Sequence, residues 1–115
     1  MIKRIQVGPR MSQAVVHGQT VYLAGQVADD PKADIATQTR QVLASIDRLL
    51  AAAGSDKTRI LRANIFLKDI GTFAEMNKVW DAWVAQGHTP ARATVQSALA
   101  TPDYQVEIMI TAALP

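Results

Sequence analysis

Residues 59–68, Arg-Ile-Leu-Arg-Ala-Asn-Ile-Phe-Leu-Lys, form the stretch that decides which fold this chain adopts. Apolar and polar residues alternate along it, which is the pattern of a β-strand with one buried face. The predicted apolar face comprises Leu61, Ala63, Ile65 and Leu67, and the polar face comprises Arg62, Asn64 and Lys68. A strand with one apolar face needs a second layer to cover that face, so helices are expected to pack on it.

A helix is predicted on each side of this strand, because apolar residues recur there every three or four positions. The earlier helix spans residues 34–53, with Asp34 as its N-cap and Gly54 as its stop. The later helix begins at Thr72, which forms a predicted capping box with Glu75. The apolar stripes, which we assign to the core, are Val42, Leu43, Ile46, Leu49, Leu50 and Ala53 in the first helix, and Phe73, Met76, Trp80, Trp83 and Val84, ending near Gly87, in the second.

Five further strands are expected from segments rich in β-branched and apolar residues. They span residues 3–7, 13–17, 20–27, 92–99 and 105–113. The last two strands are expected to form a hairpin that turns about Thr101-Pro102. This order predicts an α+β fold in a single domain over residues 1–115, with a mixed six-stranded sheet and both helices on one face.

The other face of the predicted sheet carries no helix and is half polar. Its expected side chains are Asn64, Arg92, Thr94, Gln96, Glu107, Met109 and Thr111. A broad uncovered sheet face is more often a subunit interface than open surface. The chain is therefore expected to form an oligomer.

Composition narrows the class of function. The hydrophobic share of 49% and charged share of 19% are ordinary for a globular domain, and no apolar run reaches the length of about 20 residues that spans a bilayer. The first residues lack the features of a secretory signal, so a cytoplasmic location is expected. The absence of cysteine excludes thiol catalysis and cysteine-based metal sites. Basic residues are not interleaved with aromatic ones, which argues against a nucleic-acid partner.

The segment Pro90-Ala91-Arg92-Ala93-Thr94-Val95 is the main candidate for a functional site. By position alone, an arginine at the start of a strand is usually just solvated. Arg92, however, is expected to share a strand face with Thr94 and Gln96, and Glu107 is expected on the matching face of the next strand. A guanidinium suits bidentate binding of a carboxylate, with Glu107 as its salt-bridge partner or as a catalytic base.

The predicted register bears on the choice between those two roles. In a hairpin that turns about Thr101-Pro102, Arg92 opposes Thr111 and Glu107 opposes Gln96. This offset of about 13 Å along the strands does not favour an ion pair within one chain. The two side chains would instead line opposite ends of one pocket or meet across a subunit boundary.

Other chemistry finds little support in the sequence. No His, Cys or carboxylate groups stand at the spacing of metal ligands, so no metal site is predicted. The serines lack a nucleophile-elbow motif, and the glycines do not form a phosphate-binding loop. Asn77 is the one polar residue on the inner side of the second helical stripe, where it serves either as a structural hydrogen-bonding group or as a site residue.

These residues, in this order, resemble the YjgF/RidA family of reactive-intermediate (enamine/imine) deaminases along essentially the whole chain. The specific part is residues 90–95 followed by Val106-Glu107-Ile108, and the other matches are residues 10–15, 22–27, 38–43 and Asn77. The resemblance implies a chorismate-mutase-like α+β fold and a homotrimer that closes the sheets into a barrel. It also implies ligand sites in the clefts between subunits.

For the chemistry, the resemblance implies that Arg92 binds a substrate carboxylate while Glu107 positions or activates the attacking water. The implied reaction is the hydrolysis of a 2-imino acid to a 2-oxo acid and ammonia, without a cofactor. Met11, Ala24 and Thr94 stand where family members with well-supported deaminase roles tend to have Tyr, Ser and often Cys. These three residues and Asn77 are the expected substrate-binding residues besides Arg92.

Two alternatives to a deaminase remain. The first is a family member that binds a carboxylate metabolite, or acts in stress as a holdase, without turnover, which the residues at Met11 and Ala24 favour. The second is ribonuclease activity, which some relatives have. Neither a basic groove nor a pair of histidines supports it in this sequence.

Overall fold

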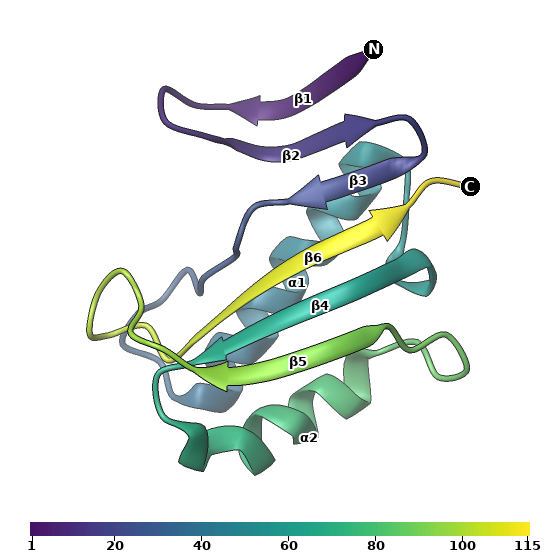
Figure 1. The fold of residues 1–115 in the computed structure, drawn as a ribbon. Coiled ribbons are helices and arrows are strands. Elements are labelled where there is room, and N and C mark those ends of the chain that lie inside the picture. The colour runs from purple at the N-terminus through teal and green to yellow at the C-terminus, as the bar shows by residue number, and fades with distance from the viewer.

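The computed structural model describes residues 1–115, which form one six-stranded sheet with two α-helices packed against the same face (Figure 1). The strands are β1 (Ile2–Val7), β2 (Ser12–His17), β3 (Thr20–Leu23), β4 (Ile60–Leu67), β5 (Ala91–Gln96) and β6 (Val106–Ala113). The α-helices are α1 (Ile35–Ala53) and α2 (Phe73–Trp83), and the short 3-10 helices are η1 (Lys57–Arg59) and η2 (Ile70–Thr72). The predicted α+β class, the number of strands and the placement of both helices are confirmed.

The strand order is β1-β2-β3-β6-β4-β5, so the strand that comes last in the chain lies in the middle of the sheet (Figure 1). β4 and β5 are parallel, and every other pair is antiparallel. The predicted hairpin between residues 92–99 and 105–113 is wrong, because β4 separates β5 from β6. α2 is the crossover that carries the chain from the end of β4 back to the start of β5, and such a crossover produces parallel neighbours.

The ends of α1 agree with the prediction. The Asp34 carboxylate accepts a hydrogen bond of 2.8 Å from the backbone N–H of Thr37, and this bond lowers the pKa of Asp34 below its usual 3.8. Gly54 ends the helix with a φ of 87°, a left-handed conformation that glycine adopts without strain. Between these caps the apolar stripe of α1 packs into the core.

The start of α2 differs from the prediction. Thr72 makes no side-chain cap and instead donates its hydroxyl to the carbonyl of Asp69 at 2.7 Å, so the capping box is wrong. The Asp69 carboxylate accepts the N–H of Gly71 and so caps η2, which leads directly into α2. Because η2 already fixes the chain entry, the helix needs no box of its own. α2 ends at Trp83, four residues before Gly87.

An irregularity at the start of β4 reverses one predicted orientation. The pairing of β4 with β6 shifts its register between Ile60 and Arg62. This bulge turns Ile60 inward, where it is 5% exposed, and turns Leu61 outward, where it is 53% exposed. The rest of the predicted apolar face is buried as expected. Neither helix has the length and apolarity required to cross a membrane.

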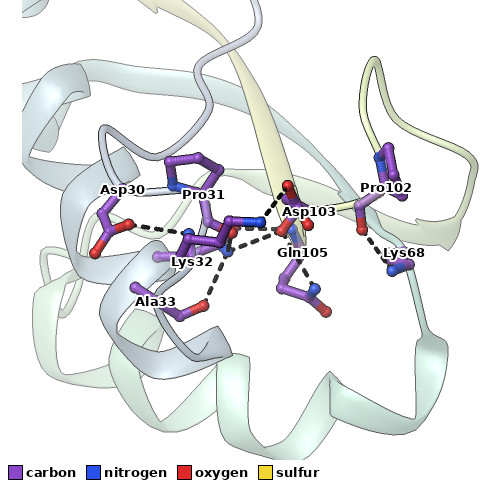
Figure 2. A network of polar contacts seen from close by, with 9 residues as sticks. Asp30, Pro31, Lys32, Ala33, Lys68, Pro102, Asp103 and Gln105 are labelled. Carbon is purple, nitrogen blue, oxygen red and sulfur yellow. Dashed lines mark hydrogen bonds and ion pairs between the residues drawn. The ribbon is translucent and has the colours of Figure 1, made fainter.

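Gln38 is a fully buried polar side chain that joins the loop before α1 to the loop before β6. Its Nε2 donates to the carbonyls of Pro31, Ala33 and Asp103, and its Oε1 accepts the N–H of Gln105 at 2.8 Å. Figure 2 shows the two loops meeting, with an ion pair of 3.0 Å between Lys32 and Asp103 beside them. This network fixes the backbone that enters β6.

Candidate functional site

Arg92 lies on the sheet face that the helices cover. In the parallel register of β4 and β5, Arg92 stands beside Ala63 and Thr94 stands beside Ile65. Neighbouring residues of a ladder project to the same side, and Ala63 and Ile65 are fully buried under the helices. The side chain of Arg92 therefore projects toward α2.

Three residues of α2 contact the Arg92 guanidinium. Its Nη1 donates a hydrogen bond of 2.7 Å to the Oδ1 of Asn77. Its Cζ lies 5.7 Å from the ring centre of Phe73 and 5.4 Å from the ring centre of Trp80, within the range of a cation–π contact. Arg92 could have been simply solvated, but these contacts show that it is not. Asn77, whose role was open, is its direct hydrogen-bond partner.

Thr94 lies on the same face, two residues beyond Arg92. Its Oγ1 is buried and has no hydrogen-bond partner in the chain. A buried hydroxyl without a partner is costly, so this atom is a candidate for a bond to a ligand. Gln96, the third residue on this face, has another task, because its Oε1 accepts the N–H of Ile70 at 2.9 Å.

Glu107 lies on the opposite face of the sheet. It pairs with Phe66 of β4, whose register places it beside Val95 rather than beside Arg92. The prediction that Arg92, Thr94 and Gln96 share the uncovered face with Glu107 is therefore wrong, because these three residues of β5 lie on the helix-covered face. Its cause is the false hairpin, since inserting β4 between the two strands changes both their separation and their relative facing.

The separation excludes direct contact between the two groups. Arg92 and Glu107 are two strands apart and three residues apart along β4, so their Cα atoms lie about 14 Å from each other. The one ion pair of the chain joins Lys32 and Asp103. An Arg92–Glu107 ion pair within the chain is absent, as the sequence analysis expected.

Glu107 lines a cavity of about 560 Å³ at the end of the sheet where β3 stops. Its carboxylate lies directly against Gly25, and a Cβ added at residue 25 would overlap the Oε2 of Glu107. The glycine thus provides the space that the carboxylate occupies. The other lining side chains include Met11, Gln13, Gln26, Arg48 and Tyr104.

Two of the predicted substrate-binding residues belong to this second region. Met11 is 47% exposed and lines the cavity beside Glu107. Ala24 is not part of the lining; its N–H donates to the carbonyl of Gln13 at 2.9 Å, and its carbonyl accepts the Nε2 of Gln26 at 3.0 Å. Its position next to Gly25 places its backbone, and not its side chain, near the cavity.

Gln13 and Gln26 were not among the expected site residues, yet their side chains are joined by a hydrogen bond of 3.0 Å and line the Glu107 cavity. Gln26 is 9% exposed. The signal for it was a polar residue within the otherwise apolar segment of residues 20–27, which the strand assignment absorbed. Phe73 and Trp80 were assigned only to the core, because helical spacing does not reveal that a charge lies against an aromatic ring.

Comparison with known proteins identifies the family of the chain. A family model described as Endoribonuclease L-PSP matches residues 1–114. The RutC family protein YoaB of Escherichia coli is 50% identical over 113 residues, which are 98% of this chain and 98% of YoaB. The crystal structure of NMB1025 from Neisseria meningitidis, a member of the YjgF protein family, has a TM-score of 0.97 and 50% identity, and it covers 100% of this chain and 96% of its own.

A more distant relative carries the name of an activity. The 2-iminobutanoate/2-iminopropanoate deaminase of Rattus norvegicus is 33% identical over 103 residues, which are 84% of this chain and 74% of the rat protein. The matched model, the relatives and the shared fold all point the same way as the segment around Arg92. The chain therefore belongs to the YjgF/RidA family.

Proposed function

We propose that this protein hydrolyses reactive 2-imino acids to 2-oxo acids and ammonia without a cofactor. The observation that carries the proposal is the Arg92 guanidinium, held on its strand by Asn77 and two aromatic rings. A fixed, permanently charged fork suits the carboxylate that every 2-imino acid carries. The rat relative named as a 2-iminobutanoate/2-iminopropanoate deaminase supports the same substrate class.

The proposed active site combines two copies of the chain, with Arg92 from one and Glu107 from another. Within one chain the two groups project from opposite sheet faces, so they do not share a small ligand. The face without helices carries exposed hydrophobic side chains at Tyr22, Val95 and Met109, which favours contact with another copy. β5 is an edge strand, and its free edge offers a further contact. We propose a homotrimer, in which each boundary between copies brings one Arg92 and one Glu107 together.

The proposed mechanism needs little more than positioning. Arg92 binds the carboxylate and holds the electrophilic C=N carbon next to a water molecule. Glu107 accepts a proton from that water as its oxygen bonds to the carbon, and returns the proton to the imine nitrogen, which gives a tetrahedral carbinolamine with one hydroxyl and one amino group. The hydroxyl proton is then transferred to the amino nitrogen, so that the C=O bond forms as the C–N bond breaks, which releases ammonia and leaves the 2-oxo acid.

A second candidate function is carboxylate binding without turnover. The observation in its favour is Met11, whose apolar side chain lines the cavity of Glu107 and offers no hydrogen bond to water or substrate. In that case 2-oxo acids would bind in a manner that depends on Arg92, but imines would hydrolyse no faster than in buffer.

The test is an assay with 2-iminopropanoate generated in situ, following the release of 2-oxo acid and ammonia. The proposal expects a rate well above that of buffer. A rate equal to buffer, with calorimetric binding of 2-oxobutanoate retained, selects the second candidate. If neither turnover nor binding is detected, both candidates are wrong.

The composite site has its own test, in which the Arg92→Ala and Glu107→Gln proteins are unfolded together and refolded as a mixture. In a cyclic trimer with random mixing, about a quarter of the sites combine an intact Arg92 with an intact Glu107. Activity should return to about that fraction of the native value. No recovery, together with a monomer in light scattering, would contradict the shared site.

A further inference from the structure

Phe73, Asn77 and Trp80 lie at positions i, i+4 and i+7 of α2, so their side chains project from one face of the helix. All three contact the guanidinium of a single residue, Arg92. Asn77 lies between the two aromatic residues along the helix axis. We infer that these three are positioning residues, an α2 cradle that holds the Arg92 guanidinium in the orientation that receives the substrate carboxylate. This inference rests on the proposed function.

The chemistry of the contacts explains how such a cradle orients the fork. A free arginine side chain samples many rotamers, and each bond to a ligand must first restrict them. Asn77 accepts a hydrogen from Nη1 only, which leaves the Nε–Nη2 edge for the two oxygens of a carboxylate. The rings of Phe73 and Trp80 attract the cation through their π-electrons without using any of its N–H groups.

The choice of an amide at residue 77 also matters. An aspartate would hold the guanidinium by the same geometry, but its charge would neutralise the arginine and repel an incoming carboxylate. Asparagine fixes the position of Arg92 and preserves its positive charge. Trp80 is 5% exposed, so the surrounding core holds its ring and a ligand does not reach it directly. Trp80 therefore acts on a ligand through Arg92.

The chain supplies a matched control in Trp83, three residues further along α2. Its indole contacts Trp80 at 5.4 Å and donates a hydrogen bond to Asp47 at 2.9 Å, and its ring lies 5.4 Å from the Nζ of Lys57. Replacing Trp83 with leucine therefore removes an aromatic ring from the same helix without removing a contact to Arg92. Trp80→Phe is the conservative variant, because it retains a ring facing the guanidinium.

The first measurement is made on the protein without ligand, by NMR of the Arg92 Nε–Hε group and its Hδ protons. The expected native result is a rigid Nε–Hε with a high heteronuclear NOE, and Hδ protons shifted upfield by the ring currents of Phe73 and Trp80. Trp80→Leu and Asn77→Ala should make this group mobile, while Trp83→Leu leaves it rigid and Trp80→Phe restores most of the rigidity. The inference is overturned if native Arg92 is as mobile as Arg59, or if the two tryptophan variants change it equally.

The second measurement compares the dissociation constants of 2-oxobutanoate and its uncharged amide. Trp80→Leu should weaken binding of the acid about tenfold and change binding of the amide little. Asn77→Asp should keep Arg92 rigid and yet weaken the acid by a similar factor. If the variants weaken binding of the acid and of the amide equally, the residues of the α2 cradle have only a structural role and the inference is wrong. If the native protein binds neither compound, the proposed function fails, and the NMR result alone decides whether the cradle exists.

Discussion

The two halves of the candidate site differ in how the chain prepares them. On the helix-covered face, Arg92 is held by a hydrogen bond of 2.7 Å and by two aromatic rings of α2. On the other side, Glu107 lies against a glycine and faces a cavity of about 560 Å³ lined from β2, the segment after β3, and α1. One half is a guanidinium held in place, whereas the other is a carboxylate with space in front of it. Under the proposed function, binding and chemistry therefore depend on separate parts of this fold.

The two halves are also supported by different helices. α2 supplies every contact to the Arg92 guanidinium described above. α1 supplies Ser45, Arg48 and Leu49 to the Glu107 cavity, and its Gln38 anchors the loop that enters β6. Substitutions in the Arg92 half should therefore alter mainly affinity, and substitutions in the Glu107 half should alter mainly kcat.

The largest effect is expected for Arg92→Ala, which removes the charged fork of the binding half. Affinity for 2-oxo acids should fall by about 3 kcal/mol, or about 150-fold, because a charge-assisted bidentate contact is lost. Calorimetry with 2-oxobutanoate measures this loss. Arg59→Ala, on an exposed residue of η1, is the control and should bind normally. Equal losses in the two variants would mean that Arg92 does not bind the ligand.

Glu107→Gln should produce the next largest effect, on turnover. The amide keeps the size of the side chain but no longer accepts a proton, so kcat should fall about 100-fold while the dissociation constant for 2-oxobutanoate changes little. Steady-state kinetics and calorimetry on the same preparation give the two values. If affinity falls as far as kcat does, Glu107 also contributes to binding, and the division into a binding half and a catalytic half is wrong.

Gln38→Leu should act on stability, and through it on the Glu107 half. The substitution leaves the N–H of Gln105 without its partner and removes the bond from Gln38 to the carbonyl of Asp103, so the free energy of unfolding should fall by about 2 kcal/mol. Urea denaturation measures this, with Gln86→Leu on the surface as the control. Because the loosened loop enters β6, kcat should fall more than affinity. If affinity falls more than kcat, this loop does not support the Glu107 half of the site.

The smallest effect concerns the pH dependence of α1. Bonding to Thr37 lowers the pKa of Asp34 in the folded protein below 3.8, so its stabilising contribution is present above that pH and is lost as pH falls through the folded pKa. Asp34→Ala should therefore destabilise the protein more at pH 7 than in acid, where the carboxyl group becomes protonated. Urea denaturation across this range checks the sign. A stability difference between the native and Asp34→Ala proteins that grows on acidification would contradict this sign. The substitution should not change the affinity for 2-oxobutanoate, which depends on Arg92.

The elements of the fold were predictable because each has a local signature. The alternation in residues 59–68 and the apolar stripes of residues 34–53 and 72–84 determine a strand and two helices without knowledge of their neighbours. The bulge that turns Leu61 outward was not predictable, since it depends on the pairing of β4 with β6. The same holds for the capping of α2, which η2 makes unnecessary.

The sequence singled out candidate residues for the site, but their predicted geometry was wrong. Arg92, Asn77 and Glu107 stood out by residue type and by family resemblance, and the structure gives the first two a direct contact. The sheet faces on which Arg92 and Glu107 project depend on which strand lies next to β5. Proximity in sequence favoured β6 as that neighbour, whereas the crossover through α2 places β4 there. The catalytic and substrate-binding roles of all the candidate residues remain predictions, namely those of Arg92, Glu107, Asn77, Thr94, Met11 and Ala24.

The central position of β6 bears on how the protein is made. During synthesis, β1–β3 and β4–β5 emerge first, and each group contains one strand, β3 or β4, whose neighbour β6 has not yet left the ribosome. Residues 106–113 must then enter between β3 and β4, pairing with both. The sheet is therefore complete only after residues 106–113 have been made, and until then the edges of β3 and β4 that pair with β6 have no partner. Glu107 arrives with that strand, so its half of the site forms only when the whole sheet does.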